Sequence, residues 1–299
     1  MTKYYHGAGK QGPYFEGWYW KLQTRKGDAL ALIPAYHIDH AGRRGTSLQI
    51  LAGGQSWWLT YPELRAFERM FCVQIGENLF TDRKLYLQIE EDGLSLCGTV
   101  RCGPFTPLKS DIMGPFRFVP GMECAHGVIS MGHPLEGRLM LNGKTLNFSG
   151  GVGYIETDRG RAFPSDYLWT QSIWQGTWPG SVMLSIAAIP MAGFRFTGCI
   201  CAVLCDGREY RLATYRGARV ERWSGTGAVI RQGKYRLSAE LLKGEGCPLR
   251  APAEGVMGRT VRESLCSTVR YRFWAGDTLL LDRTDRCAGF EYAENGGIS

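Results

Sequence analysis

The sequence predicts an all-β protein built from two antiparallel β-barrels or β-sandwiches, with little helix. Three observations lead to this fold class. The chain has 40 glycines and 12% aromatic residues, a combination that favours short strands and tight turns over long helices. Short runs of β-forming residues recur along the whole chain between turn residues. Its 44% hydrophobic and 21% charged residues are typical of a globular protein that can bury a core.

The first half of the chain contains a series of such runs. They predict strands at residues 14–22, 28–38, 46–51, 55–60, 70–75, 84–90, 94–101, 126–131, 136–141 and 145–149. The segment LNGKT at 141–145 places an Asn-Gly pair at a hairpin turn. One segment, PELRAFERM at 62–70, is predicted to be helical, because Pro62 suits a first helical turn.

The second half repeats the pattern. Its predicted strands lie at residues 167–174, 181–189, 194–205, 208–215, 218–223, 226–231, 234–242, 266–274, 277–282 and 287–292. The segments CDGRE at 205–209 and WAGDT at 274–278 again join Gly and Asp at hairpin turns. We therefore expect two domains, residues 1–155 and residues 156–299, each closed to remove exposed strand edges.

The charge pattern limits the partners. The formal charge is +7, and basic residues are scattered singly rather than gathered into the patch or stripe that nucleic-acid binding requires. No stretch approaches the roughly 18 uninterrupted apolar residues of a membrane-spanning helix. We expect no nucleic-acid partner and no membrane span, with contact to a membrane surface left open.

The ten cysteines include no C-x-x-C pair, and no apolar N-terminal stretch resembles a signal peptide. We therefore expect a cytoplasmic protein with free thiols. Cys199, Cys201 and Cys205 share one face of a predicted strand, where small buried hydrophobic residues are favoured over a metal site. We expect no metal and no cofactor.

The segment GGVGYIETDRGRAFPSDYLWTQ at 150–171 carries the main candidate site. If it is extended, Tyr154, Glu156 and Asp158 point the same way. Two neighbouring carboxylates can raise one another's pKa and keep a proton available, with one as the acid and the other orienting it. The alternative is structural, in which Asp158 pairs with Arg159 or Arg161 and fixes the turn between the domains.

Two further motifs supply candidates. MECAHG at 122–127 contains Glu123 and His126, and a His beside a Glu can act as a general base. The alternative for His126 is a hydrogen bond to a backbone carbonyl. In YFEGWYW at 14–20, Tyr14, Glu16 and Trp18 share a strand face and are candidates to line a pocket, or to be ordinary core.

The later strand places Trp169 and Gln171 on one face. A buried Gln can donate and accept, so Gln171 is a candidate to hold an oxygen of a ligand while Trp169 stacks on a ring of that ligand. The alternative is a Gln that bridges the two barrels.

Four ordered segments together carry a resemblance. They are PYFEGWYWK at 13–21, MGPFRFVPGMECAHGVISMGHPLEG at 113–137, the 150–171 segment and GFEY at 289–292. In these segments the chain resembles the tocopherol cyclase family. The resemblance implies two lipocalin-like β-barrels and a relationship to carotenoid hydratases and β-barrel Diels-Alderases.

The resemblance also implies a reaction without metal or redox cofactor. In that family the alkene of a prenylated hydroquinone is protonated, and the phenol oxygen traps the tertiary cation. Such chemistry needs a dry apolar site, a proton donor and aromatic faces that stabilise a cation. We expect a cyclase, hydratase or isomerase acting on a hydrophobic isoprenoid or quinol. The alternatives are a non-catalytic lipid or isoprenoid carrier and a pericyclase that needs no acid.

Overall fold

A computed structural model describes residues 3–91, 93–119, 122–176, 179–191, 194–244 and 246–294. Within these residues the chain is almost wholly β, with two short 3-10 turns, η1 (Gly114–Phe118) and η2 (Thr214–Arg216). The predicted all-β class is therefore confirmed. In the described part of the chain no helix has the length and apolar character needed to cross a membrane.

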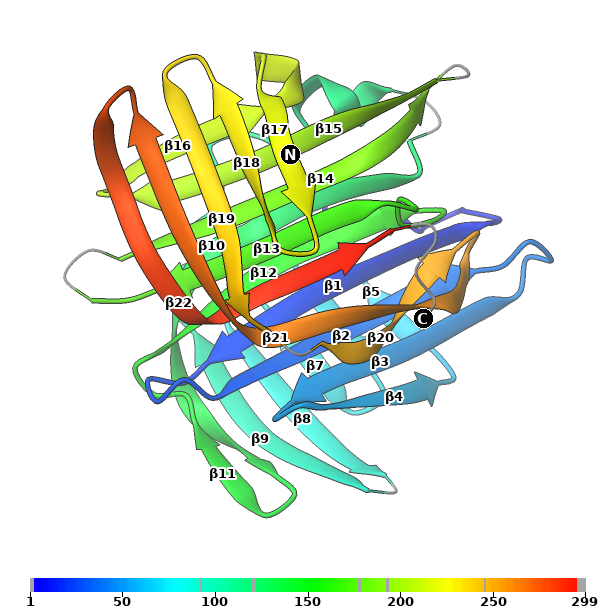
Figure 1. Cartoon of the computed structure of the whole chain (residues 1–299). Coiled ribbons are helices and arrows are strands. Elements are labelled where there is room, and N and C mark those ends of the chain that lie inside the picture. The colour runs from blue at the N-terminus through cyan, green and yellow to red at the C-terminus, as the bar shows by residue number, and fades with distance from the viewer. Residues whose placement is uncertain are drawn as a thin grey trace. The chain divides into compact units, whose positions relative to one another are not determined.

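The first sheet holds the strands of the first half of the chain (Figure 1). They are β1 (Tyr14–Gln23), β2 (Ala29–Ile38), β3 (Arg44–Ala52), β4 (Gln55–Tyr61), β5 (Leu64–Ala66), β6 (Cys72–Ile75), β7 (Asn78–Thr81), β8 (Lys84–Glu91), β9 (Leu94–Cys102), β10 (Cys124–Leu141), β11 (Lys144–Asn147) and β12 (Gly151–Gly160). Their order is β4-β3-β2-β1-β12-β10-β9-β8-β7-β6-β5, with β11 paired to β10.

The second sheet holds the remaining strands (Figure 1). They are β13 (Tyr167–Trp174), β14 (Gly180–Met191), β15 (Phe194–Cys205), β16 (Arg208–Ala213), β17 (Arg219–Ser224), β18 (Gly227–Gln232), β19 (Tyr235–Lys243), β20 (Cys247–Ala253), β21 (Val256–Ala275) and β22 (Thr278–Ala293). Their order is β16-β15-β14-β13-β22-β21-β19-β18-β17, with β20 paired to β21.

Contacts divide the chain into two compact units. Unit 1 comprises Met1–Pro107, Glu123–Phe163 and Arg250–Arg259, and unit 2 comprises Leu108–Met122, Pro164–Leu249 and Thr260–Ser299. The expected boundary between residues 155 and 156 falls inside β12, a strand of unit 1. The segment 108–122, from the first half of the sequence, belongs to unit 2.

The sheet of unit 1 curls so that one face encloses the core. Trp20 on β1 stacks on Phe71 at 5.4 Å and lies 5.9 Å from Phe80 on β7, although β12, β10, β9 and β8 separate β1 from β7 in the sheet. The amide of Asn78, on β7, reaches the Tyr61 hydroxyl on the opposite edge strand β4 at 3.3 Å. Residues from both ends of the sheet therefore share one apolar core, which also includes Trp18 and Ile155.

Unit 2 curls in the same manner. Tyr210 on β16 lies 5.6 Å from Tyr235 on β19 and 5.1 Å from Phe273 on β21. Gln232 on β18 donates to the Arg211 carbonyl on β16 at 3.1 Å, so strands from the two ends of this sheet approach one another. Each unit thus has a core face, turned toward its own apolar cluster, and an outer face.

Local sequence accounts for the turn between β10 and β11, whereas pairing between strands overturns one expectation. Asn142 and Gly143 both adopt positive φ, +46° and +79°, as the predicted hairpin between β10 and β11 requires. The predicted helix at 62–70 is wrong: Leu64–Ala66 forms β5 and pairs with β6. A helix of about nine residues is marginal on its own, whereas pairing with β6 places Leu64 and Ala66 against the core.

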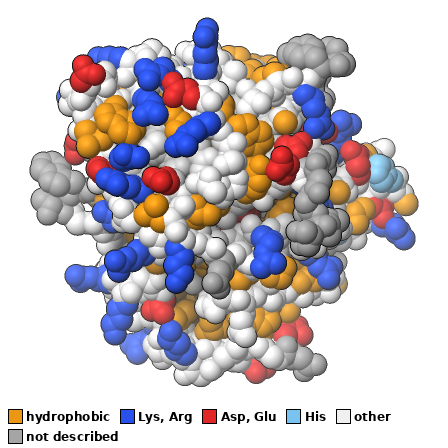
Figure 2. Space-filling view, viewed as in Figure 1, with side chains coloured by type: hydrophobic (Ala, Val, Ile, Leu, Met, Phe, Trp, Pro, Cys, Tyr) orange, Lys and Arg blue, Asp and Glu red, His pale blue; other side chains and the backbone are white. Residues whose placement is uncertain are grey.

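Charged side chains are scattered over the surface, as they are along the sequence. On the face shown in Figure 2, basic side chains are dispersed among acidic and neutral ones, singly or in small groups.

Candidate functional site

Strand β12 presents three polar side chains on the outer face of the unit 1 sheet. Alternation along the strand sends Ile155 into the core, whereas Tyr154, Glu156 and Asp158 point to the other face. Tyr154 is 0% exposed and Glu156 is 4% exposed, while the Asp158 side chain is 21% exposed. The expectation that these three residues share a face agrees with the strand register.

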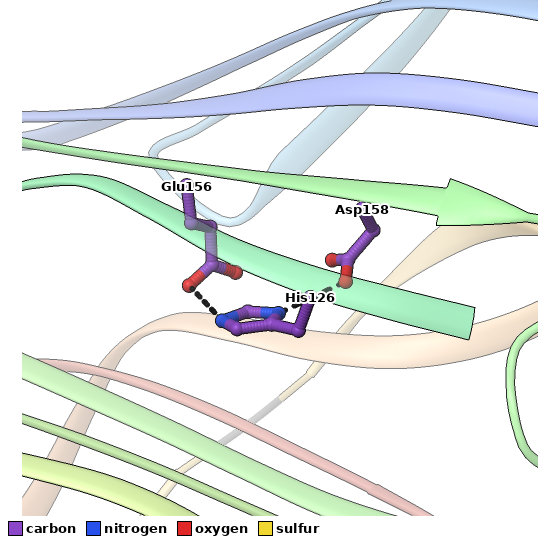
Figure 3. A group of neighbouring side chains, drawn as sticks. All are labelled: His126, Glu156 and Asp158. Carbon is purple, nitrogen blue, oxygen red and sulfur yellow. Dashed lines mark hydrogen bonds and ion pairs between the residues drawn. The ribbon is translucent and has the colours of Figure 1, made fainter. Parts of the chain in front are cut away.

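Strand β10 brings His126 to the same place. In the antiparallel register His126 lies directly opposite Asp158, and Val128 lies opposite Glu156. Directly opposed residues on neighbouring strands share a face. His126 therefore inserts its ring between the two carboxylates (Figure 3). Its Nδ1 lies 2.9 Å from Asp158 Oδ1, and its Nε2 lies 3.4 Å from Glu156 Oε2.

The two contacts of the ring are unequal. Nδ1 and Asp158 form a hydrogen bond, whereas Nε2, although within ion-pair distance of Glu156, makes no hydrogen bond of acceptable geometry. Two other groups extend the cluster: Tyr154 donates its hydroxyl to Glu156 Oε2 at 2.5 Å, and the Cys124 thiol donates to Asp158 Oδ1 at 3.4 Å. We call His126, Glu156 and Asp158 the outer-face triad.

The electrostatics of the triad favour a charged imidazole. Burial alone would lower the pKa of His126, but the carboxylates of Asp158 and Glu156 and their hydrogen-bonding capacity outweigh it and raise this pKa well above its ordinary value. Burial, and then the neighbouring carboxylate, raise the pKa of Tyr154 and the pKa of Cys124. The two carboxylates therefore favour the protonated form of the His126 ring.

The triad also has the donor set of a metal site. One ligand atom from each of the three residues lies within 4.8 Å of the other two. A divalent cation bound there would have to displace the proton that both carboxylates hold on the imidazole.

In the structural alternative for Asp158, its carboxylate pairs with Arg159 or Arg161. Among the described residues, the cation within 4 Å of Asp158 is His126 rather than Arg159 or Arg161. Arg161 instead lies 4.0 Å from Glu123. Glu123 precedes β10 and is outside the triad, so the structure separates it from His126.

Tyr14, Glu16 and Trp18 lie on the core face of the same sheet, away from the triad. In the β1–β12 register Gly17 is opposite Asp158, so the side chains on either side of Gly17 point to the other face. Trp18 is fully buried in the unit 1 core. The carboxylate of Glu16, also fully buried, accepts hydrogen bonds from the Tyr14 hydroxyl at 2.8 Å and from the His6 backbone at 2.8 Å.

Trp169 and Gln171 lie on β13 in unit 2. Their side chains share a face with Tyr167, and that face is opposite to the one carrying core residues such as Leu168 and Trp174. Both residues are buried.

Two residues that bind the candidate carboxylates, Cys124 at Asp158 and His6 at Glu16, were not predicted from the sequence. Cys124 was detectable, because it stands two residues before His126 on an extended segment and must share its face. His6 gave no such signal, since its Nδ1 reaches Glu16 at 2.9 Å from a segment outside any strand.

Comparison with known proteins supports the fold. No protein-family model and no curated protein sequence matches this chain. Among solved structures, CghA with Sch210972 superposes with a TM-score of 0.57 at 12% identity, covering 95% of this chain and 90% of CghA. Kievitone hydratase from Nectria haematococca gives a TM-score of 0.52 at 11% identity, with 95% and 90% covered.

A candidate AttH protein from Nitrosomonas europaea gives a TM-score of 0.53 at 13% identity, covering 93% of this chain and 91% of that one. Similarity at these identities establishes the fold, and it confirms the lipocalin-like β architecture that the family resemblance implied.

Proposed function

We propose that this chain is a cofactor-independent enzyme that protonates the alkene of an unsaturated hydrophobic substrate, with the outer-face triad as its proton donor. The observation that carries the proposal is a buried imidazole held between two carboxylates, His126 between Glu156 and Asp158. Among the structural neighbours, kievitone hydratase is named for a hydratase reaction.

Each member of the triad has a different part in the proposal. Asp158 holds Nδ1–H and fixes the ring orientation, as the carboxylate of a His–Asp pair does. Nε2–H has no well-formed hydrogen bond and is the proton to be delivered. Glu156, next to Nε2, keeps a negative charge where a cation develops on the substrate.

The proposed reaction balances without a redox partner. The π electrons of the alkene form a new C–H bond with the Nε2 proton and leave a tertiary cation on the neighbouring carbon. A phenol oxygen of the substrate then forms a C–O bond and loses its proton, which returns to Nε2. In a hydratase, water takes the place of the phenol. The closed-ring product is an isomer of the substrate.

For the substrate we propose a prenylated quinol or another isoprenoid, following the resemblance to tocopherol cyclases. A carrier is the second candidate, favoured by the CghA structure with Sch210972, because a neighbour of this fold holds a small molecule. Replacement of the Glu156 and Asp158 carboxylates distinguishes the two proposals. An enzyme loses turnover, whereas a carrier still binds its ligand.

The test is incubation of the purified protein with prenylated hydroquinones in deuterated water, followed by mass spectrometry. An enzyme of this type yields a chromanol with one deuterium on carbon. His126→Asn and the double variant Glu156→Gln, Asp158→Asn should give no product, whereas Glu123→Gln, outside the triad, should turn over normally. Product formation that survives both triad variants favours a pericyclase, and ligand retention without product favours the carrier.

A further inference from the structure

Five side chains form a continuous row across the outer face of unit 2. The register places Arg219 on β17 opposite Arg231 on β18, and Arg231 opposite Arg236 on β19. Arg236 lies opposite Trp274 on β21, and Trp274 lies opposite Leu279 on β22. These strands are neighbours in the sheet (Figure 1). We call these five residues the arginine row.

The arginine row is accessible from solvent. Residues next to it along the strands, such as Ile230 and Leu237, belong to the unit 2 core, so the row faces away from that core. Arg219 is exposed, the Arg231 side chain is 53% exposed and Leu279 is 47% exposed. Residues that are far apart in the sequence are therefore gathered on one surface by the pairing of the strands.

The three arginines of the row carry more positive charge than the carboxylate beside them balances. Like charges that lie directly opposite on neighbouring strands destabilise a sheet. Glu221 relieves part of this repulsion, because it accepts hydrogen bonds from Arg231 Nε at 2.7 Å and from Arg236 Nε at 3.3 Å. One carboxylate thus serves two guanidinium groups, and Arg219 adds a third positive charge. The row is complementary to an anionic partner.

Arginines on the adjacent parts of the outer face differ, because they have carboxylates of their own. Arg270 donates to Asp282 through Nε at 2.9 Å and through a terminal nitrogen at 2.7 Å. Arg272 lies 3.7 Å from Glu240. Arg222, exposed on β17, adds a further positive charge beside the row. The excess of positive charge is therefore concentrated at the arginine row and not spread over the whole sheet.

The other end of the row is apolar. Trp274 and Leu279 form a cross-strand pair next to Arg236. At membrane surfaces, tryptophan side chains lie at the level of the lipid headgroups, and basic side chains are attracted to anionic lipids. A row that changes from guanidinium groups to apolar side chains matches the change from headgroups to acyl chains.

Two other kinds of partner fit this surface less well. Small-molecule sites are concave, whereas the row lies on the outer side of a sheet that curls around its core. Single-stranded nucleic acids stack their bases on free aromatic faces. The Trp274 ring already has two guanidinium groups over it, that of Arg236 at 5.3 Å and that of Arg272 at 5.5 Å from its centroid.

We propose that the arginine row binds the anionic surface of a lipid bilayer. The three guanidinium groups contact headgroup phosphates, and Trp274 and Leu279 contact the boundary with the acyl chains. This surface adds to the proposed function, because hydrophobic substrates concentrate in bilayers, but it does not depend on that function. Its test measures binding without turnover.

The test is flotation of the full chain with vesicles of phosphatidylcholine alone or of phosphatidylcholine and phosphatidylglycerol in equal parts. The wild type should bind the anionic vesicles, and added salt should weaken that binding. The variant Arg219→Gln should bind them about fivefold more weakly, and the triple variant Arg219→Gln, Arg231→Gln, Arg236→Gln about a hundredfold more weakly. Trp274→Ala with Leu279→Ser should weaken binding without changing its salt dependence. Measurement of Tm separates loss of binding from loss of the fold.

The matched control replaces three other exposed arginines by Gln, Arg83, Arg101 and Arg138 of unit 1. It removes the same charge and should bind as the wild type does. Equal losses in the two triple variants would show that net charge alone attracts the protein and would overturn the arginine row. A wild type that binds anionic vesicles no better than neutral ones, or binds a single-stranded oligonucleotide but no vesicle, also overturns the proposal. Vesicle binding by a protein that turns over no substrate counts only against the proposed function.

Discussion

The His126 ring faces Asp158 across the β10–β12 strand pair, with Nδ1 2.9 Å from Oδ1. The carboxylates of Glu156 and Asp158 therefore interact with an imidazole between them rather than directly with one another. The sequence predicted that one carboxyl group acts as an acid and the other orients it, whereas the structure places the His126 ring between them, where both carboxylates raise its pKa.

Substitution of Asp158 by Asn should lower the pKa of His126. Asp158 is the foremost of the groups that raise this pKa, and without its charge the burial of the ring, which lowers the pKa, has less opposition. Titration of the His126 ring protons by NMR measures the change. Glu123→Gln is the control, since Glu123 pairs with Arg161 instead. An unchanged His126 titration in the Asn variant would contradict the assigned role of Asp158.

The stability of unit 1 should depend on the charge of His126. Its pKa is raised in the folded state, so the stabilisation is complete below the unfolded value of about 6.5 and is lost as pH rises through the folded pKa. His126→Leu leaves two carboxylates without their cation and should cost about 3–5 kcal/mol at neutral pH. Urea unfolding from pH 6 to pH 10 should show a fall in the wild type that the variant lacks.

A triple variant separates charge from packing in that experiment. Adding Glu156→Gln and Asp158→Asn to His126→Leu removes the unpaired negative charges and should recover part of the lost stability. If the triple variant is no more stable than His126→Leu alone, the loss comes from packing around the ring and not from the charges.

His133 should make unit 1 sensitive to acid. It is buried on the core face beside Phe105, and burial lowers its pKa to about 3. Because the folded pKa is depressed, the neutral ring favours folding above the unfolded pKa of about 6.5, and that contribution is lost as pH falls toward 3. Between pH 7 and pH 4.5 the free energy of unfolding should fall by about 2 kcal/mol through this group.

Urea unfolding of the wild type and of His133→Leu at pH 7 and at pH 4.5 tests the predicted fall. The loss of unfolding free energy between the two pH values is compared for the two proteins. His37 also has a pKa lowered by burial and should contribute acid sensitivity to both proteins. The part of the acid loss that disappears in His133→Leu is therefore assigned to His133. Equal acid losses in the two proteins would contradict the assignment.

Much of the fold and part of the site could be predicted from the sequence. The predicted strand at 167–174 coincides with β13, and the Asn142–Gly143 turn lies where expected, because both depend on local residue preferences. Alternation along β12 correctly placed Tyr154, Glu156 and Asp158 on one face. These features can be predicted because they depend only on residues that are close together in the sequence.

The remaining features depend on pairing between distant segments. The short segment at 62–70 became a strand because β6 offers it a partner, which its own residues do not reveal. The contact between His126 and Asp158 depends on the register of β10 against β12, and that register contains bulges. Alternation could group Glu16 with Trp18, but it could not show that their face of β1 is the core face.

Glu16 should prove to be a stabilising residue of the unit 1 core rather than part of the triad's chemistry. Its fully buried carboxylate accepts from the His6 backbone, from His6 Nδ1 and from Tyr14, and it faces away from Asp158. In Glu16→Gln an amide N–H would face these donors, which should cost about 2–3 kcal/mol of stability. Tyr14→Phe, which removes one donor only, should cost about 1 kcal/mol.

Chemical denaturation measures both costs, and turnover per folded molecule should stay at the wild-type level because the triad is unaltered. The opposite result, normal stability with lost turnover in Glu16→Gln, would show that the core face of β1 contacts the substrate. Trp18→Phe then tests whether Trp18 is a core residue or lines a substrate pocket. A core tryptophan replaced by Phe lowers stability with unchanged substrate affinity, whereas a pocket tryptophan raises KM at nearly unchanged stability.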